Sequence, residues 1–228
     1  MIPWEHIETV EVPGNGGSLR LSKRGEEFSI TVDRYEIMNS RVYGSAEALA
    51  QLACARLPNP QNARILVGGL GMGYTLAETL KQIGPRGEAV VAELVPAVVK
   101  WNRGPLAHLA GHPLNDVRTT VREVDVAQIL KEEHTAYDAI LLDVDNGPEG
   151  LARRANNWLY SPAGLEAARD ALRPKGVLAV WSAAPSGAFI RRMRSAGFWT
   201  DEICVGERGP QDGPRITIFI GSARPPGF

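Results

Sequence analysis

The stretch "ILVGGLGMGYT", residues 65–75, is an apolar run that breaks into glycine and then resumes with the residues of a helix. Four glycines, at positions 68, 69, 71 and 73, crowd this junction. Glycine weakens strands and helices alike, so such a cluster serves a tight turn or a close approach of the backbone to a ligand. The spacing predicts a ligand-binding loop, with a purely structural turn as the alternative.

From residue 64 onward, short apolar runs alternate with helical stretches. Such alternation predicts parallel strands joined by crossover helices, an α/β doubly wound sheet. The end of the chain differs, because two strand-like runs, 199–207 and 215–222, follow each other with only a turn between them. An antiparallel hairpin that closes a parallel sheet is typical of the Rossmann-like, methyltransferase-type variant. We predict a domain of this type over residues 61–228.

Residues 1–60 read differently. The runs 6–12, 18–24 and 27–37 alternate polar and apolar residues and are separated by glycine-rich turns, a pattern of antiparallel strands. A helix is predicted over 45–57, with Ser45 placed to cap it. We therefore expect a small N-terminal β region and a connecting helix ahead of the larger domain.

The composition narrows the functional classes. The chain has 228 residues and a formal net charge of -1, which gives no basic field for nucleic acid. Its start carries charges and a proline where a signal peptide needs an apolar run, and no segment resembles a membrane span. Cys54 and Cys204 lack metal-ligand spacing and are expected to be buried thiols, so we predict a cytoplasmic protein that binds neither nucleic acid nor membrane.

The glycine pattern favours a nucleoside over a dinucleotide. A dinucleotide fingerprint needs a third glycine where Tyr74 stands, and no Gly-Lys-Ser/Thr of a phosphate-binding loop follows. Ligands of open α/β sheets lie at the carboxyl ends of the strands, where strand order reverses. The spacing fits a nucleoside cofactor that lacks a pyrophosphate.

Acidic residues end three successive predicted strands. Glu93 lies about 20 residues beyond the loop, where a carboxylate can accept both ribose hydroxyls; the alternative is a surface carboxylate. Asp125 is placed either to accept from an adenine amino group or only to cap the next helix. Asp143 ends the fourth strand, and the three together predict a nucleoside site.

These features resemble the spermidine synthase-like family, a branch of the S-adenosylmethionine-dependent methyltransferase fold. The resemblance runs from about residue 33 to the last strand and rests on the glycine loop, the strand "YDAILLD", the segment "NGPEG" and residues 159–181. It implies binding of S-adenosylmethionine or its decarboxylated form, with methylthioadenosine as product, and a homodimer. Gly69, Gly71 and Gly73 would contact this cosubstrate together with Glu93 and Asp125.

The resemblance also implies aminopropyl transfer to an amine. An amine has a pKa of about 10.4 and arrives protonated, so a carboxylate must take its proton. Asp143 is the predicted catalytic base. The family's second aspartate of Asp-x-x-Asp falls on Asn146, and the aspartate of its glycine loop falls on Gly71.

Other residues near these positions are candidates to bind the acceptor. They are Tyr43, Glu47, Asp145, Asn146 and Tyr160. The alternatives are purely structural roles: a helix cap for the residues around position 45 and simple packing for Tyr160.

Three functions stay open on the sequence. The first is an aminopropyltransferase-like enzyme that acts on a small molecule, an amine. The second is an S-adenosylmethionine-dependent methyltransferase, and the third is a non-catalytic nucleoside-binding protein of the same fold. His108 and His112 are four residues apart, but Gly111 and Pro113 end any helix there, so no metal is predicted.

Overall fold

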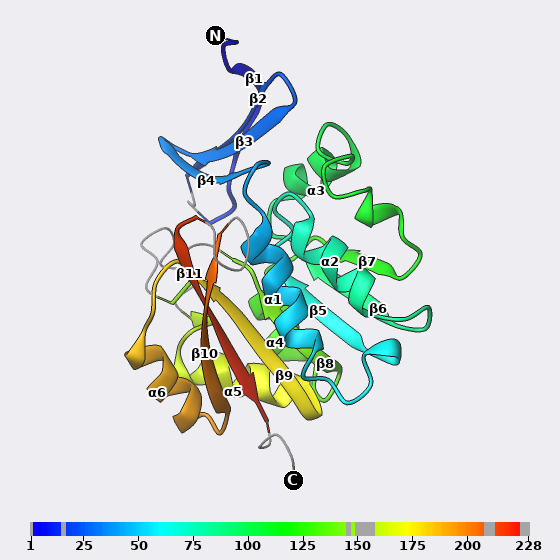
Figure 1. Cartoon of the computed structure of the whole chain (residues 1–228), viewed down its shortest axis with the longest axis vertical. Helices are drawn as coiled ribbons and strands as arrows, with labels where there is room; N and C mark the ends of the chain where they lie inside the picture. The colour runs from blue at the N-terminus through cyan, green and yellow to red at the C-terminus, as the bar shows by residue number, and fades with distance from the viewer. Residues whose placement is uncertain (1, 15–16, 145–146, 149–157, 208–212, 224–228) are drawn as a thin grey trace.

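The N-terminal part of the chain forms a four-stranded antiparallel sheet at one end of the larger domain (Figure 1). The computed structural model describes residues 2–14, 17–144, 147–148, 158–207 and 213–223. The sheet runs in the order β1-β2-β3-β4. Its strands are β1 (Glu5–Glu11), β2 (Ser18–Arg24), β3 (Glu27–Val32) and β4 (Tyr35–Asn39).

The larger sheet has seven strands in the order β10-β11-β9-β8-β5-β6-β7. Five neighbouring strands are parallel to one another: β9, β8, β5, β6 and β7. Strand β11 runs antiparallel to both β9 and β10. Their bounds are β5 (Arg64–Gly68), β6 (Glu88–Ala92), β7 (Thr119–Arg122), β8 (Tyr137–Leu142), β9 (Leu172–Ser182), β10 (Trp199–Gly206) and β11 (Arg215–Ser222). This order confirms the predicted doubly wound sheet with a C-terminal antiparallel hairpin.

Strand order reverses between β5 and β8. The chain goes from β5 outward to β6 and β7, then returns to place β8 on the other side of β5. The carboxyl ends of β5 and β8 therefore flank the crevice in which such sheets bind ligands.

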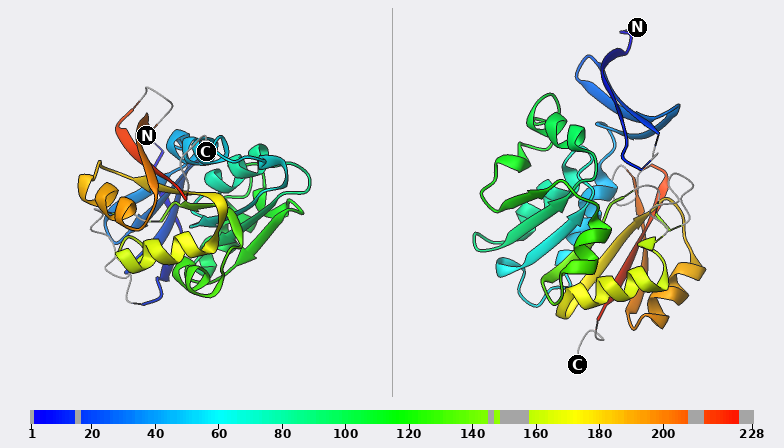
Figure 2. Two further views of the ribbon diagram at one scale, coloured as in Figure 1. Left: turned by 90° about the horizontal axis from the view of Figure 1, so that it is seen from below. Right: turned by 180° about the vertical axis from the view of Figure 1, so that it is seen from behind.

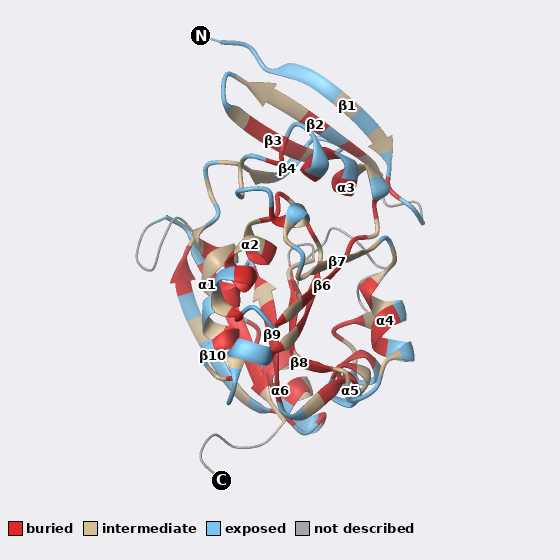
Figure 3. Cartoon of the chain, turned by 90° about the vertical axis from the view of Figure 1, so that its right-hand side faces the viewer, coloured by how far each residue is buried: buried red, intermediate tan, exposed pale blue. Residues whose placement is uncertain are grey.

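Helices cover both faces of the sheet and make two separate apolar cores. One core includes residues of α1 (Gly44–Cys54), α2 (Tyr74–Gln82) and α3 (Pro96–Arg103), and the other includes residues of α4 (Val126–Glu132), α5 (Pro162–Ala171) and α6 (Gly187–Ser195). Seen from behind, α5 and α6 lie over the second face (Figure 2). The central strands are buried on both sides, as Figure 3 shows, because successive side chains alternate between the two cores.

The N-terminal sheet is apolar on one face only. Leu19, Leu21, Phe28 and Ile30 are buried and join the core that also contains α1, α2 and α3. The edge strand β1 is largely exposed, and its Glu8 accepts hydrogen bonds from two α3 residues, from Trp101 Nε1 at 2.7 Å and Lys100 Nζ at 2.9 Å. The sheet is thus anchored to the larger domain by packing and by one carboxylate.

Three local predictions are wrong. The run 27–37 is two strands, because Asp33 adopts a left-handed conformation (φ 53°) and turns the chain. Ser45 does not cap α1: the helix starts at Gly44 without a side-chain cap, and Ser45 Oγ instead accepts a hydrogen bond from Trp181 Nε1. Cys54 is buried as expected, but Cys204 is exposed because it lies on the edge strand β10.

Candidate functional site

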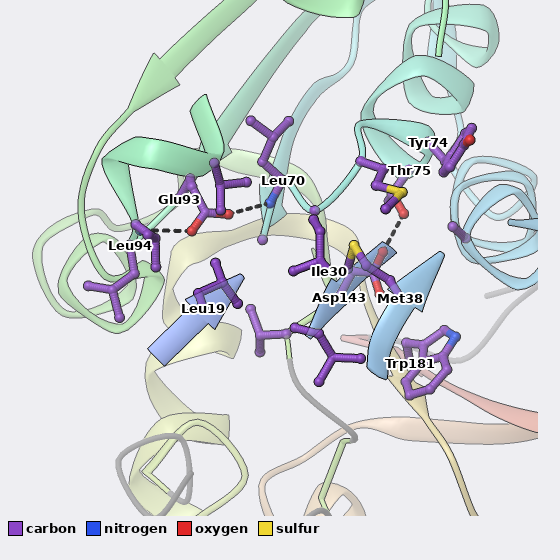
Figure 4. A pocket seen from close by; sticks show the side chains of 18 of the residues that line it. Leu19, Ile30, Met38, Leu70, Tyr74, Thr75, Glu93, Leu94, Asp143 and Trp181 are labelled. Atoms are coloured by element: carbon purple, nitrogen blue, oxygen red, sulfur yellow. Dashed lines mark hydrogen bonds between the residues drawn. The ribbon is translucent and has the colours of Figure 1, made fainter. Parts of the chain in front are cut away.

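A cavity of about 340 Å³ lies between the N-terminal sheet and the carboxyl ends of β5, β6 and β8 (Figure 4). The sheet contributes an apolar wall that includes Leu19, Ile30 and Met38. The opposite wall contains the glycine loop and the acidic strand ends. The cavity therefore lies at the switch point of the strand order.

The glycine loop needs glycine for two different reasons. Gly69, Gly71 and Gly73 all have positive φ, of 90°, 53° and 86°. Gly69 also lies against the end of β8, so that a Cβ there would be 2.4 Å from the carbonyl oxygen of Asp143. Gly69 and Gly71 line the cavity, whereas Gly73 precedes the first turn of α2 and faces Asn102 and Pro113.

Glu93 is a buried carboxylate, not a surface one. Its side chain is only 8% exposed and accepts hydrogen bonds from the backbone N–H of Leu70 at 3.0 Å and of Val95 at 2.8 Å. Burial raises the pKa of Glu93, and these N–H groups oppose the rise. The carboxylate thus fixes the glycine loop to the end of β6 at the cavity wall.

Asp125 lies at the start of α4 and at the cavity wall. Its side chain accepts a hydrogen bond from Ala127 N at 2.8 Å and caps α4. The same residue also lines the cavity, as does the neighbouring Val126. The helix-cap role is therefore present, and the adenine role stays a prediction.

Asp143 follows β8 and borders the same cavity. Its Oδ2 accepts a hydrogen bond of 2.5 Å from the hydroxyl of Thr75, at the start of α2. Burial raises the pKa of Asp143, and the bond from Thr75 opposes the rise. A half-buried carboxylate with a raised pKa at a cavity wall is suited to accept a proton.

Of the predicted acceptor-binding residues that the structure describes, only one lines the cavity. Tyr43 lines the cavity and stacks on Tyr74, with 4.6 Å between ring centroids. Glu47 does not reach the cavity and lies 3.8 Å from Lys81 Nζ. Tyr160 is buried outside the cavity lining, where its hydroxyl donates to the carbonyl of Val144. Asp145 and Asn146 lie outside the described residues.

Several residues of the site were not predicted from the sequence. They are Met38 and Glu36 on β4, Thr75 on α2, Asn102 on α3, Trp181 on β9 and Glu207 after β10. Asn102 is 2% exposed and donates to the carbonyl of Gly71 at 2.8 Å, so it holds the loop from behind. Trp181 could have been predicted, because it lies one residue before the end of β9 and ligands bind at the carboxyl ends of such strands.

The charged residues among the described lining of the cavity are all acidic. Five carboxylate residues line it, and its described lining contains no Lys, Arg or His; the five are Glu36, Glu93, Asp125, Asp143 and Glu207. A lining of this kind favours a positively charged ligand.

The described part of the chain also bears on metal binding and on membrane insertion. No group of three or more His, Cys, Asp or Glu there is arranged to hold a metal ion. His108 packs edge-on against Phe28, and His112 adopts a left-handed conformation before a short 3-10 helix, Pro113–Asn115. None of the described helices combines the length and apolar character needed to cross a bilayer.

Comparison with known proteins places the chain in a family. Residues 43–186 match the spermine/spermidine synthase domain. Polyamine aminopropyltransferase 1 of Streptomyces coelicolor is 30% identical over 196 residues, which cover 82% of this chain and 34% of that protein. Putrescine N-methyltransferase 4 of Nicotiana tabacum is 34% identical over 134 residues, which cover 58% of this chain and 32% of that protein.

The fold has close counterparts among solved structures. A spermidine synthase in complex with the transition-state analogue AdoDATO superimposes with a TM-score of 0.79 at 19% identity, over 96% of this chain and 74% of that one. The chain spans about a third of the length of the curated relatives named above. On the match of residues 43–186, the chain belongs to the spermine/spermidine synthase family.

Proposed function

We propose that this protein is a transferase that moves an aminopropyl group from an adenosyl sulfonium cosubstrate to an amine. The observation that carries the proposal is the half-buried carboxylate of Asp143, at the switch point of the sheet, in a cavity whose described lining is acidic and lacks basic residues. The curated relatives named above are a polyamine aminopropyltransferase and a putrescine N-methyltransferase, and both names specify an amine.

The proposed cosubstrate is decarboxylated S-adenosylmethionine. Its sulfonium and ammonium groups are both cationic and suit the acidic lining. S-adenosylmethionine carries a further carboxylate, for which the described lining offers no Lys, Arg or His. We propose that Glu93 accepts the ribose hydroxyls, that Asp125 faces the adenine, and that Gly69 and Gly71 let the nucleoside approach the backbone.

The proposed reaction is a direct displacement. The amine nitrogen attacks the propyl carbon bonded to sulfur, the carbon–sulfur bond breaks, and its electron pair stays on sulfur, which leaves methylthioadenosine. The attacking ammonium must first lose a proton, and Asp143 accepts it. The raised pKa of Asp143 narrows the gap to the amine, whose pKa is about 10.4.

Product analysis by mass spectrometry tests this function. Wild type should convert decarboxylated S-adenosylmethionine and a diamine or monoamine of a panel to methylthioadenosine and an aminopropylated amine. Asp143→Asn should lower turnover by about 10²–10⁴, the usual share of a positioned base. It should keep the thermal shift that the nucleoside produces. Asp170→Asn, on the exposed end of α5, is the matched control and should leave turnover unchanged.

Three other outcomes contradict the proposal. Equal turnover of wild type and Asp143→Asn would remove Asp143 from the chemistry. A methylated amine formed only from S-adenosylmethionine would make the protein a methyltransferase. Nucleoside binding without turnover on any amine would make it a binding protein.

A further inference from the structure

Two threonines one turn apart on α2 use their hydroxyls differently. Thr79 Oγ1 donates to the carbonyl of Thr75 at 2.8 Å, the ordinary bond of a helical threonine to the residue four positions before it. Thr75 Oγ1 donates instead to Asp143 Oδ2 at 2.5 Å, as Figure 4 shows. The carbonyl four positions before Thr75, that of Gly71, accepts a hydrogen bond from Asn102 Nδ2 at 2.8 Å. The hydroxyl of Thr75 is thus directed at the proposed base and not at its own helix.

The backbone on both sides of this bond is held in place. Thr75 is buried in the first turn of α2, where a β-branched side chain has few allowed rotamers. The N–H of Asp143 donates to the carbonyl of Gly68 at 2.9 Å, which ties Asp143 to the end of β5. Thr75 and Asp143 both line the cavity. The bond between their side chains therefore sets how the carboxylate is turned at the cavity wall.

The bond also affects the charge of Asp143. A carboxyl group can take a proton from an amine only while it is ionised. A hydroxyl that donates to a carboxylate favours the ionised form. Burial raises the pKa of Asp143, and the bond from Thr75 opposes that rise. Without the hydroxyl, burial would keep Asp143 protonated up to a higher pH.

We propose that Thr75 is a positioning residue of the transfer reaction: its hydroxyl holds one oxygen of Asp143 and keeps the carboxylate ionised, so that the other oxygen accepts the proton of the amine. Thr75 acts through Asp143 and takes no proton itself. This proposal rests on the proposed function, in which Asp143 is the base.

The pH dependence of kcat tests the proposal, with decarboxylated S-adenosylmethionine and the amine that product analysis identifies both saturating. Wild type should lose turnover as pH falls through the pKa of Asp143, because only the ionised form accepts a proton. Thr75→Val replaces the hydroxyl with a methyl group and should move this acid limb upward by about one to two pH units, the contribution of a hydrogen bond to a charged group. Thr75→Ser keeps the hydroxyl and should return the limb close to that of wild type. An acid limb of Thr75→Val that coincides with that of wild type would overturn the proposal.

Thr79→Val is the matched control, since it makes the same exchange at a buried position one turn along α2. Its acid limb should stay where that of wild type lies. A shift as large as that of Thr75→Val would assign the effect to packing of the helix and overturn the proposal. The other titratable residues of the described cavity lining are Glu36, Glu93, Asp125, Glu207, Tyr43 and Tyr74. They are the same in every variant, so the difference between variants reports the hydroxyl.

A titration without turnover separates failure of this proposal from failure of the proposed function. The carbon-13 signal of the Asp143 carboxyl, assigned by its loss in Asp143→Asn, should give a higher pKa in Thr75→Val than in wild type or Thr75→Ser. Thr75→Ala, which also lacks the hydroxyl, takes the place of the valine variant if that variant does not fold. If wild type transfers no aminopropyl group to any amine, the proposed function fails. If it does, and either the acid limb or the pKa of Asp143 is unchanged without the hydroxyl, the function stands and the role of Thr75 is wrong.

Discussion

Asp143 and Glu93 border one cavity, yet the chain satisfies their carboxylates to different degrees. Glu93 accepts two backbone N–H groups, which hold it and the glycine loop in place. Asp143 accepts one hydroxyl, that of Thr75. Burial raises the pKa of both. For Asp143, a single hydrogen bond opposes the effect of burial, so its raised pKa costs stability and favours proton transfer. Asp143 and Glu93 therefore fit different roles.

Asp143→Asn should stabilise the ligand-free protein in a pH-dependent way. Because the pKa of Asp143 is raised on folding, the folded protein binds more protons than the unfolded chain above the ordinary carboxyl pKa. The free energy of unfolding of wild type therefore falls as pH rises through the raised pKa. The variant lacks this loss and keeps an oxygen for Thr75. Its advantage should be roughly 1.4 kcal/mol for each unit by which the pKa is raised.

Denaturant unfolding at about pH 4 and about pH 8 measures this, since the window starts near the ordinary carboxyl pKa. The advantage of the variant should be small at the lower pH and larger at the higher one. Glu26→Gln, an exposed residue before β3, is the control and should show no such trend. A variant that is less stable than wild type at the higher pH would contradict the assigned cost.

At the scale of elements, Gly69 lets the backbone that follows β5 lie against the backbone that follows β8. A Cβ on Gly69 would clash with the backbone of Asp143, which cannot move as a flexible side chain does. The loop is held from behind by Asn102 of α3. The position of the base relative to the loop is therefore set by the backbone contact between Gly69 and Asp143 and by the side chain of Asn102.

Gly69→Ala should destabilise the protein more than Gly111→Ala does. Both glycines have positive φ, 90° and 72°, so both variants incur the left-handed strain of about 1–2 kcal/mol. A Cβ at Gly111 meets nothing within 4 Å, whereas one at Gly69 meets the carbonyl oxygen of Asp143. Overpacking adds about 1–3 kcal/mol to the Gly69 variant. Equal losses in thermal or denaturant unfolding would show that the strands can separate without cost.

At the scale of the whole molecule, the N-terminal sheet closes one side of the cavity. Its inner face supplies Leu19, Ile30 and Met38 to the lining. Glu8 fixes β1 to α3, and the hydrogen bond from Trp101 lowers the pKa of Glu8, with a further contribution from Lys100. This contact is present above the ordinary carboxyl pKa and is lost as pH falls through the lowered one.

Glu8→Ala should loosen the sheet and weaken nucleoside binding together. Amide exchange should become faster in β2 and β3 and stay unchanged in α5, which lies in the other core. The nucleoside should lose affinity because the cavity loses part of its apolar wall. Glu11→Ala, an exposed position on the same strand, is the control. Unchanged exchange in β2 and β3 would show that packing alone holds the sheet.

The periodicity of the sequence was sufficient for the elements of the large domain and for its doubly wound class. Alternation of apolar and polar residues is a local property, and it identified the strands and helices from residue 64 to 222. It joined β3 and β4 into one run, because an aspartate in a left-handed turn leaves no signal as clear as a glycine does. The strand-end rule located Glu93, Asp125 and Asp143, since parallel strands end at one edge.

The rest depended on contacts between segments far apart along the chain. Met38 meets Gly71, and Thr75 meets Asp143, only because the folded sheet and helix bring them together. Glu47 turns toward Lys81 instead of the cavity because α1 packs beside α2. The sequence was enough to predict the strands, the glycine loop and its acidic partners, because these follow from local periodicity and from one rule of topology. The walls of the cavity and the neighbours of each carboxylate required the folded chain, because side-chain direction and desolvation arise only from packing.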